Sequence, residues 1–311
     1  MYSIYRTSHK KMQKLTEFTQ GSWIELTAPS LEECTAVAEE YDIDITDLRA
    51  ALDDEESSRI SMEDNYTLIL VDIPSAEIRN NRNSYTTIPL GILLHPDAII
   101  TVCAEDTSIL KRFTDQRVRD FSTKKQMRFL YQILYNTSML YQALLRSIDR
   151  KRTEIEERIN QEDTEDADLV DLHELESNLV YFATSLRANG VVIDRLTRYG
   201  RLKMYEEDQE LLEDVVIENR QAIEMTGIYR DIINGTRELL STVINNRLNN
   251  AMKYLAAITI VMSIPTIVSG LWGMNVFVPM AEIQHGFAII VISTLIMCIA
   301  ALVVLHRRKM L

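Results

Sequence analysis

Residues 254–275 read YLAAITIVMSIPTIVSGLWGMN, and this stretch decides the fold. Its first part, Tyr254–Trp272, carries no charge, and a second uncharged run follows at Gly286–Leu305. A helix needs about 20 apolar residues to cross the hydrocarbon core of a bilayer, and both runs are of that length. The two runs, separated only by the short segment 273–285, therefore predict a membrane hairpin. Two buried helices in a large soluble core are the alternative, which the charged residues flanking both runs disfavour.

Lysine and arginine flank the hairpin on one side only. Arg247 and Lys253 precede the first run, Arg307, Arg308 and Lys309 follow the second, and the connecting segment contains neither residue type. Because basic residues remain on the cytoplasmic side of a membrane, we expect both termini in the cytoplasm and the connecting loop outside. The chain would then be a multi-pass protein of an inner or plasma membrane, in contact with lipid.

Charge is segregated along the chain. Four basic residues and one acidic residue give the segment 250–311 a charge of +3, so the segment 1–249 carries −16 and the whole chain −13. An acidic body argues against a nucleic-acid partner, because phosphate binding favours a basic surface. The cysteines Cys34, Cys103 and Cys298 show no disulfide or metal-ligand spacing, which favours a reduced cytoplasmic compartment. Phosphate-binding loops and HExxH or Ser/His/Asp signatures are missing from the sequence, so we expect neither enzymatic activity nor an organic cofactor.

A polar stripe runs along the first apolar run. Its members are mostly small or polar, recur at alternating spacings of three and four, and are Asn249, Met252, Ala256, Thr259, Ser263, Thr266, Gly270 and Gly273. A seven-residue period is typical of parallel helices supercoiled about a shared axis. The hydroxyl groups on successive positions predict a wet path along that axis. Helix packing without a pore is the alternative, since small residues also let helices approach closely.

The same register continues toward the N-terminus through Glu238 and Asp231. Rings of acidic side chains around an axis attract cations and repel anions. The stripe therefore predicts a cation path, although a solvated helix face would also be polar.

The N-terminal body is predicted to be mixed α and β. Runs of β-branched and aromatic residues at 60–73 and 86–102 predict strands, and two short helices are expected at 31–41 and 45–52. Long amphipathic helices follow at 124–160 and about 168–196, and a third at 205–272. The predicted organisation has the following parts: 1–120 an α/β domain, 121–204 an antiparallel helical hairpin, 205–253 a stalk helix, 254–275 and 286–305 the membrane helices, 276–285 an external loop, and 306–311 a basic tail.

The first membrane helix ends in Trp272-Gly273-Met274-Asn275, and here the sequence resembles the CorA family of magnesium and cobalt transporters. That family carries an aromatic-Gly-Met-Asn motif at the end of the first of two C-terminal membrane helices. The resemblance implies a funnel-shaped homopentamer in which an α/β cytoplasmic domain and long helices precede the membrane hairpin.

The resemblance also implies a function. Hydrated Mg²⁺ would pass through the membrane, with Co²⁺ and Ni²⁺ as further candidate ions, and intracellular Mg²⁺ would gate the pore as a regulatory ligand. Gly273, Met274 and Asn275 would form the selectivity filter. Because Mg²⁺ holds its waters tightly, the neutral oxygens of the Asn275 side chain and the Gly273 backbone suit a hydrated ion.

The stripe assigns the pore wall, and counting back from the family's motif assigns the cytoplasmic approach. Thr259, Ser263, Thr266 and Gly270 belong to the stripe and would line the pore. The cytoplasmic approach would consist of the funnel residue Glu238, the throat residues Asn249 and Met252, and Leu255 as a hydrophobic constriction able to gate by dewetting.

The resemblance also suggests a regulatory metal site. Counting on from Asp64-Asn65-Tyr66 places Glu77 at the family's acidic sensor position. Counting back from the Gly-Met-Asn motif places Asp214 at the partner position, with Glu218 one turn on. One or two carboxylates plus waters are a usual Mg²⁺ ligand set.

Two rival functions and several properties stay open. Residues 276–282 read VFVPMAE and depart from the family's usual external loop, so the role of Glu282 and the physiological ion are left open. A Zn²⁺ exporter on the same scaffold is one rival, although such relatives typically alter the Met that this chain keeps at position 274. A non-conducting coiled-coil scaffold or sensor is the rival of another class. Direction of transport, gating threshold and symmetry of opening do not follow from the sequence.

Overall fold

The protein is described by a computed structural model that covers residues 2–8, 11–79, 81–161, 166–198, 206–276 and 285–308. It divides into two compact units, Met1–Arg237 and Glu238–Leu311, which are described separately. The loop residue Glu282 lies outside the described residues.

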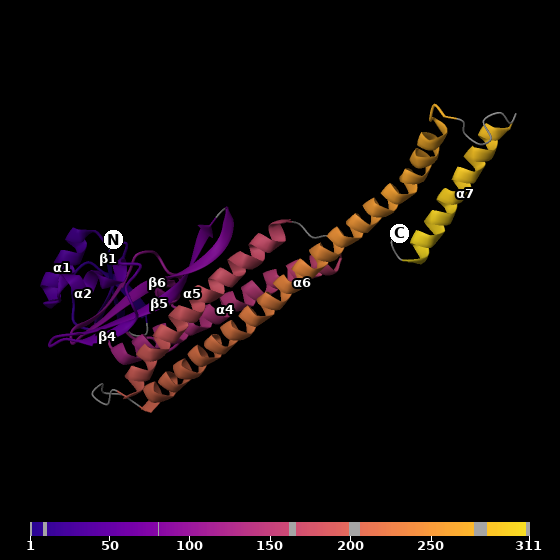
Figure 1. Cartoon of the computed structure of the whole chain (residues 1–311). Helices are drawn as coiled ribbons and strands as arrows, with labels where there is room; N and C mark the ends of the chain where they lie inside the picture. Colours follow the sequence, from indigo (N-terminus) through magenta and orange to yellow (C-terminus); the bar gives the residue numbers. More distant parts are fainter. Residues whose placement is uncertain are drawn as a thin grey trace. The chain divides into compact units, whose positions relative to one another are not determined.

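A seven-stranded mixed sheet forms the centre of the first unit (Figure 1). Its strands lie in the order β2-β1-β3-β7-β6-β5-β4, and all neighbours are antiparallel except β3 and β7. The strands are β1 (Tyr2–Ser8), β2 (Lys11–Leu15), β3 (Ser22–Thr27), β4 (Arg59–Met62), β5 (Thr67–Arg79), β6 (Arg82–His95) and β7 (Ala98–Cys103).

Each strand region expected from the sequence is in fact a pair of strands. A turn at residues 63–66, closed by the Glu63 amide donating to the Tyr66 carbonyl, separates β4 from β5. A second turn, centred on Pro96 and Asp97, separates β6 from β7. β5 also runs to Arg79, beyond the predicted end, because its polar outer half continues to pair with β6.

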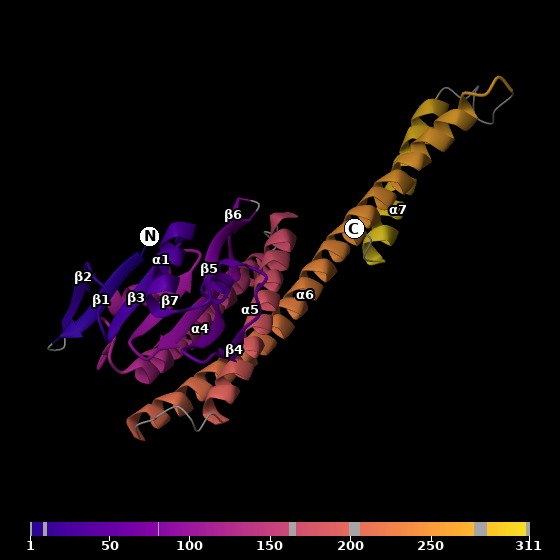
Figure 2. The same cartoon turned by 90° about the vertical axis from the view of Figure 1, so that its left-hand side faces the viewer.

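Helices cover both faces of the sheet (Figure 2). One face carries α1 (Leu31–Tyr41), α2 (Ile45–Arg49) and the 3₁₀ turn Ala50–Leu52, over a core that includes Ile24, Val37 and Leu48. The predicted helices at 31–41 and 45–52 are thus confirmed. Ser30 caps α1 in a reciprocal box with Glu33, as expected for a Ser-x-x-Glu start.

The opposite face packs against α3 (Ser108–Thr114), α4 (Gln126–Asn160), α5 (Asp166–Arg198) and the start of α6 (Glu206–Trp272). At its centre the fully buried Trp23 packs edge-on against Phe129 and donates from Nε1 to Oγ1 of Thr101 at 2.8 Å. The predicted pair of long helices is confirmed in α4 and α5.

α5 and α6 pack antiparallel, and two side-chain contacts fix their register. Asn219 donates from Nδ2 to the Leu186 carbonyl at 3.2 Å, and Arg237 pairs with Glu176 at 3.0 Å. These contacts fix which residues of α5 lie beside which residues of α6.

The second unit contains the remainder of α6, from Glu238 to Trp272, and α7 (Gly286–Arg307). Both helices are long and apolar enough to span a membrane, and only 6% of the most apolar window of each is buried. This exposure argues against the alternative of two core helices in a soluble protein.

Candidate functional site

The polar stripe is exposed along its whole length in the second unit. Asn249, Met252 and the six further members from Ala256 to Gly273 are all classed as exposed. The residues of α6 that are buried or half-buried in this span follow a different face and are Ala257, Val261, Ile264, Val268 and Trp272.

That second face of α6 packs against α7. The Val261 carbonyl contacts Sγ of Cys298 at 3.9 Å, and Val268 and Trp272 line a groove together with α7 residues such as Ile290. Successive residues of an α-helix are rotated by about 100°, so the two faces point about 180° apart. The stripe is therefore left bare on the side of α6 away from α7.

The hydroxyl groups of the stripe donate back to their own helix. Thr259 bonds to the Leu255 carbonyl at 2.8 Å, Ser263 to Ile260 at 2.7 Å and Thr266 to Met262 at 3.0 Å. Since each hydroxyl has one proton and two acceptor lone pairs, the exposed oxygens are left as acceptors. Acceptors are what the water shell of a cation, which presents O–H groups outward, requires.

The Gly-Met-Asn motif lies immediately after α6. The Gly273 amide donates to the Ser269 carbonyl at 2.9 Å, so the helical bonding continues to this residue. A Cβ at position 273 would lie 3.1 Å from that same carbonyl oxygen, a tight contact that favours glycine here. Met274 and Asn275 follow in an exposed bend, with polar Asn275 accessible to solvent.

The proposed throat residue Met252 and the proposed constriction residue Leu255 have exposed apolar side chains. Met252 is 61% and Leu255 67% exposed in the single chain. Glu238 and Asn249 are exposed as well. All four lie on α6 in the second unit.

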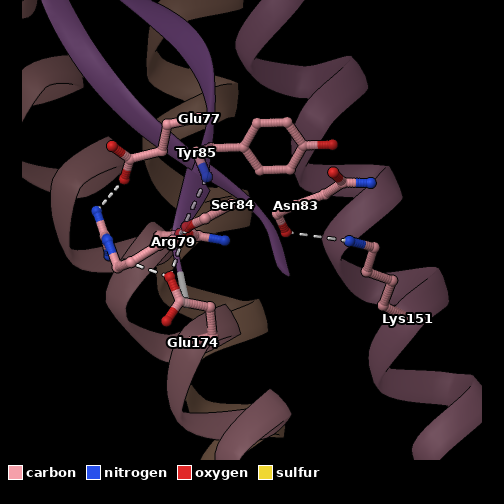
Figure 3. Close-up of polar contacts among 8 residues, drawn as sticks. Glu77, Arg79, Asn83, Ser84, Tyr85, Lys151 and Glu174 are labelled. Atoms are coloured by element: carbon pink, nitrogen blue, oxygen red, sulfur yellow. Dashed lines mark hydrogen bonds and ion pairs between the residues drawn. The ribbon is translucent and has the colours of Figure 1, made fainter. Parts of the chain in front are cut away.

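Glu77, the first of the three predicted sensor residues, is already paired in the first unit. Its carboxylate forms an ion pair with the guanidinium of Arg79 two residues on. Figure 3 shows Arg79 between two carboxylates, the second being that of Glu174 at 3.1 Å. A cation that binds Glu77 must therefore compete with Arg79.

Asp214 and Glu218 lie elsewhere in the same unit. Asp214 is exposed, whereas Glu218 is half-buried and accepts from Nε2 of Gln142 at 2.6 Å. Through Arg79, Glu77 lies beside Glu174 of α5, 12 residues from Leu186. Asp214 lies on α6 five residues from Asn219, the partner of Leu186, in the opposite direction along the antiparallel pair. The offset is about 17 residues, or about 25 Å of helix, so one chain does not bring all three residues together. Within the described residues, no cluster of three or more His, Cys, Asp or Glu side chains could hold a metal ion.

Val261 of α6 and Cys298 of α7 were missed by the sequence reasoning as functional candidates. Cys298 of α7 meets the carbonyl of Val261, four residues before Pro265. The proline is a signal in the sequence for an unpaired carbonyl, but nothing in the sequence identifies which residue of the second helix lies opposite it.

The comparison with known protein families decides the identity. The profile described as "CorA-like Mg2+ transporter protein" matches residues 19–307. This chain belongs to the CorA family. A family member named as a cobalt/magnesium transport protein, CorA of Methanocaldococcus jannaschii, is 26% identical over 297 residues, which are 92% of this chain and 90% of that protein.

Solved structures of CorA relatives share the fold. The complete CorA magnesium transporter of M. jannaschii matches with a TM-score of 0.84 at 23% identity, covering 100% of this chain and 99% of that one. The full-length CmaX protein matches with 0.71 at 14% identity, over 98% and 97%. The cytoplasmic domain of ZntB from Vibrio parahaemolyticus matches with 0.53 at 13% identity, over 80% and 97%.

Membership in the CorA family confirms the predicted fold class and identifies the protein as a divalent-cation transporter of a membrane. Mg²⁺ is the transported ion of this family. The comparisons name no residues of the stripe, the motif or the three sensor carboxylates.

Proposed function

We propose that five copies of this chain surround a pore lined by the polar stripe, and that hydrated Mg²⁺ passes along it. The observation that carries this proposal is the position of α7 on the face of α6 opposite the stripe. If the α6 helices gather about an axis with their stripes inward, α7 lies outward against lipid, where its apolar surface belongs. The number five follows the resemblance to the CorA family.

The residues along the path suit an ion that keeps its hydration shell. Glu238 attracts cations at the cytoplasmic end, and Asn249 and Met252 form the throat. Leu255 forms a constriction that closes by excluding water. The oxygens of Thr259, Ser263 and Thr266 accept hydrogen bonds from the ion's waters, because their own protons are held by the helix.

The mouth of the pore selects the ion. Gly273 keeps the backbone bare, and the Asn275 side chain offers a neutral oxygen to a water of the hydrated ion. A neutral oxygen binds the hydrated ion weakly enough to release it, unlike a ring of carboxylates. Co²⁺ and Ni²⁺ are candidate ions for the same path, and the name of the M. jannaschii relative supports Co²⁺ alongside Mg²⁺.

Both termini face the cytoplasm in this proposal, with the loop after Asn275 outside. The membrane potential then drives Mg²⁺ inward with about 2.3 kcal/mol per charge per 100 mV, or about 4.6 kcal/mol for a divalent ion. No nucleotide is required as an energy source.

Regulation is proposed to occur between neighbouring subunits. Because one chain separates Glu77 from Asp214, a shared Mg²⁺ must bridge Glu77 of one subunit to Asp214 and Glu218 of the next. Mg²⁺ binding would close the pore, and like charges on the facing carboxylates would favour opening once the ion leaves. Arg79, which pairs with Glu77, would be displaced.

Growth of a bacterium without its own Mg²⁺ uptake tests the proposal. The parent chain should rescue growth at low Mg²⁺, and Asn275→Ala should not. Asn246→Ala is the matched control, because Asn246 is exposed on α6 outside the polar stripe. Equal rescue by Asn275→Ala would contradict the filter. No rescue by a membrane-inserted parent would favour a non-conducting scaffold, or an exporter if the cells instead gained resistance to Zn²⁺.

A further inference from the structure

Pro265 creates a gap in the hydrogen bonding of α6. A residue in a helix normally donates its N–H to the carbonyl four residues earlier, but proline has no N–H. The carbonyl of Val261 therefore lacks its helical donor within an otherwise continuous helix. In a membrane, such a freed carbonyl is satisfied by a neighbouring helix, a side chain, an ordered water or a local change in the helical bonds.

The second helix supplies that partner. Sγ of Cys298 lies 3.9 Å from the Val261 carbonyl oxygen, within the longer reach of a sulfur donor, and the thiol is half-buried. This S–H group is a weak donor that joins α7 to the backbone of α6. The carbonyl that it contacts is the one that Pro265 leaves without a helical donor.

An apolar groove of about 520 Å³ begins at Pro265 and Cys298 and ends at Trp272, Gly273 and Phe287. The outer segment of α6, Thr266–Gly273, thus has free volume beside it, whereas the thiol contact marks the inner end of that space. This segment leads directly into Met274 and Asn275.

We propose that Cys298 is a positioning residue for the filter: its thiol anchors α6 to α7 at Val261, the proline-weakened point about which the segment Thr266–Gly273 pivots. The inference rests on the proposed pore and filter, and it adds the residue that holds them in place. The groove gives the segment room to tilt, and the anchor sets the position from which Asn275 meets the ion.

A double-mutant cycle tests this anchor in the full chain reconstituted in liposomes. Cys298→Ala removes the donor, Cys298→Ser keeps one, and Pro265→Ala returns an N–H to the Val261 carbonyl. In the parent background, Cys298→Ala should lower the maximal Mg²⁺ uptake rate by about two- to fivefold, the ratio that a weak hydrogen bond is worth. Cys298→Ser should restore it, and Cys298→Ala should have no effect in the Pro265→Ala background.

Thr294→Ala is the matched control. Thr294 lines the same groove from α7, but its hydroxyl donates to the Ile290 carbonyl of its own helix at 2.8 Å. Its effect should therefore be the same with and without Pro265→Ala. Equal effects of Cys298→Ala in the two backgrounds would overturn the anchor and assign Cys298 to packing alone.

A second readout does not depend on transport. The S–H stretching band of Cys298, isolated by subtracting the infrared spectrum of Cys298→Ser, should lie at lower wavenumber in the parent than in Pro265→Ala. A band at the same position in both would overturn the proposal. If the parent conducted no ion, the proposed function would fail, while this band would still decide the anchor.

Discussion

Nε2 of Gln142 lies 2.6 Å from Oε2 of Glu218 and 3.1 Å from the Glu218 carbonyl oxygen. One buried amide of α4 thereby fastens α6, the helix that continues into the apolar second unit, to the first unit. The contact also fixes the side chain of one proposed sensor residue.

Replacing Gln142 with leucine should destabilise the chain by about 1–3 kcal/mol, because a half-buried carboxylate and a carbonyl lose their donor together. Thermal unfolding of the full chain in detergent measures this. Gln209→Leu, at an exposed position of α6, should change the melting temperature little. Equal shifts for the two variants would show that the amide contributes no specific bond.

Asp72 of β5 should make stability depend on pH. Burial raises the pKa of its carboxyl, and hydrogen bonds from Ser185 and Ser58 only partly offset this. A folded-state pKa above the unfolded value of about 3.9 means that the ionised group destabilises the fold at neutral pH, and that this cost fades as pH falls toward 4. Asp72→Asn should thus be more stable than the parent at pH 7, with a difference that shrinks toward pH 4. A difference that stays constant, or that grows on acidification, would contradict this assignment.

Removing a hydroxyl of the polar stripe should lower Mg²⁺ uptake more than removing an equivalent hydroxyl of α7. Thr259→Val keeps the shape of the side chain and removes its acceptor oxygen. Each chain of a ring loses a bond worth about 0.5–1.5 kcal/mol, so Mg²⁺ uptake by liposomes should fall by about tenfold or more. Thr294→Val removes a hydroxyl that donates within α7 in the same way, and it should retain most of the uptake. Equal losses would mean that both threonines serve helix packing.

Glu238 should act through its charge. Glu238→Gln should slow Mg²⁺ flux at low ionic strength and approach the parent rate at high salt, where the Debye length falls to about 3 Å at 1 M. Glu224→Gln, at an exposed position of α6 in the first unit, serves as the charge-matched control. A salt-independent defect in Glu238→Gln would indicate a structural role.

The membrane hairpin and long helices could be predicted from the sequence because their signals are local. Uncharged runs as long as Tyr254–Trp272 and Gly286–Leu305 have few alternatives to a membrane span. A long segment whose few breakers, Pro265 and isolated glycines, are tolerated predicts one helix over 205–272. The strand regions were less accurate. The apolar pattern of 60–73 does not show that Glu63 and Tyr66 close a turn within it.

The candidate sites show the same difference between local signals, which the sequence contains, and contacts across the fold, which it does not. The polar stripe repeats along one helix, so its common face followed from spacing alone. The partners of Glu77 did not follow from the sequence, because they depend on the β5–β6 hairpin lying beside Glu174 of α5. Cys298 is 37 residues from Val261, and contacts across a helix pair depend on a register that single-chain periodicity does not contain.

The most direct test of the pore is a comparison of the two faces of α6 by substituted cysteines. A water-soluble, membrane-impermeant thiol reagent is added to liposomes that contain Ser263→Cys, Thr266→Cys, Ile264→Cys or Val268→Cys, and Mg²⁺ flux is recorded, with the parent chain as control for native cysteines. The account predicts block of flux for the stripe positions 263 and 266 and unchanged flux for positions 264 and 268, which face α7. Block at 264 and 268 with unchanged flux at 263 and 266 would contradict it.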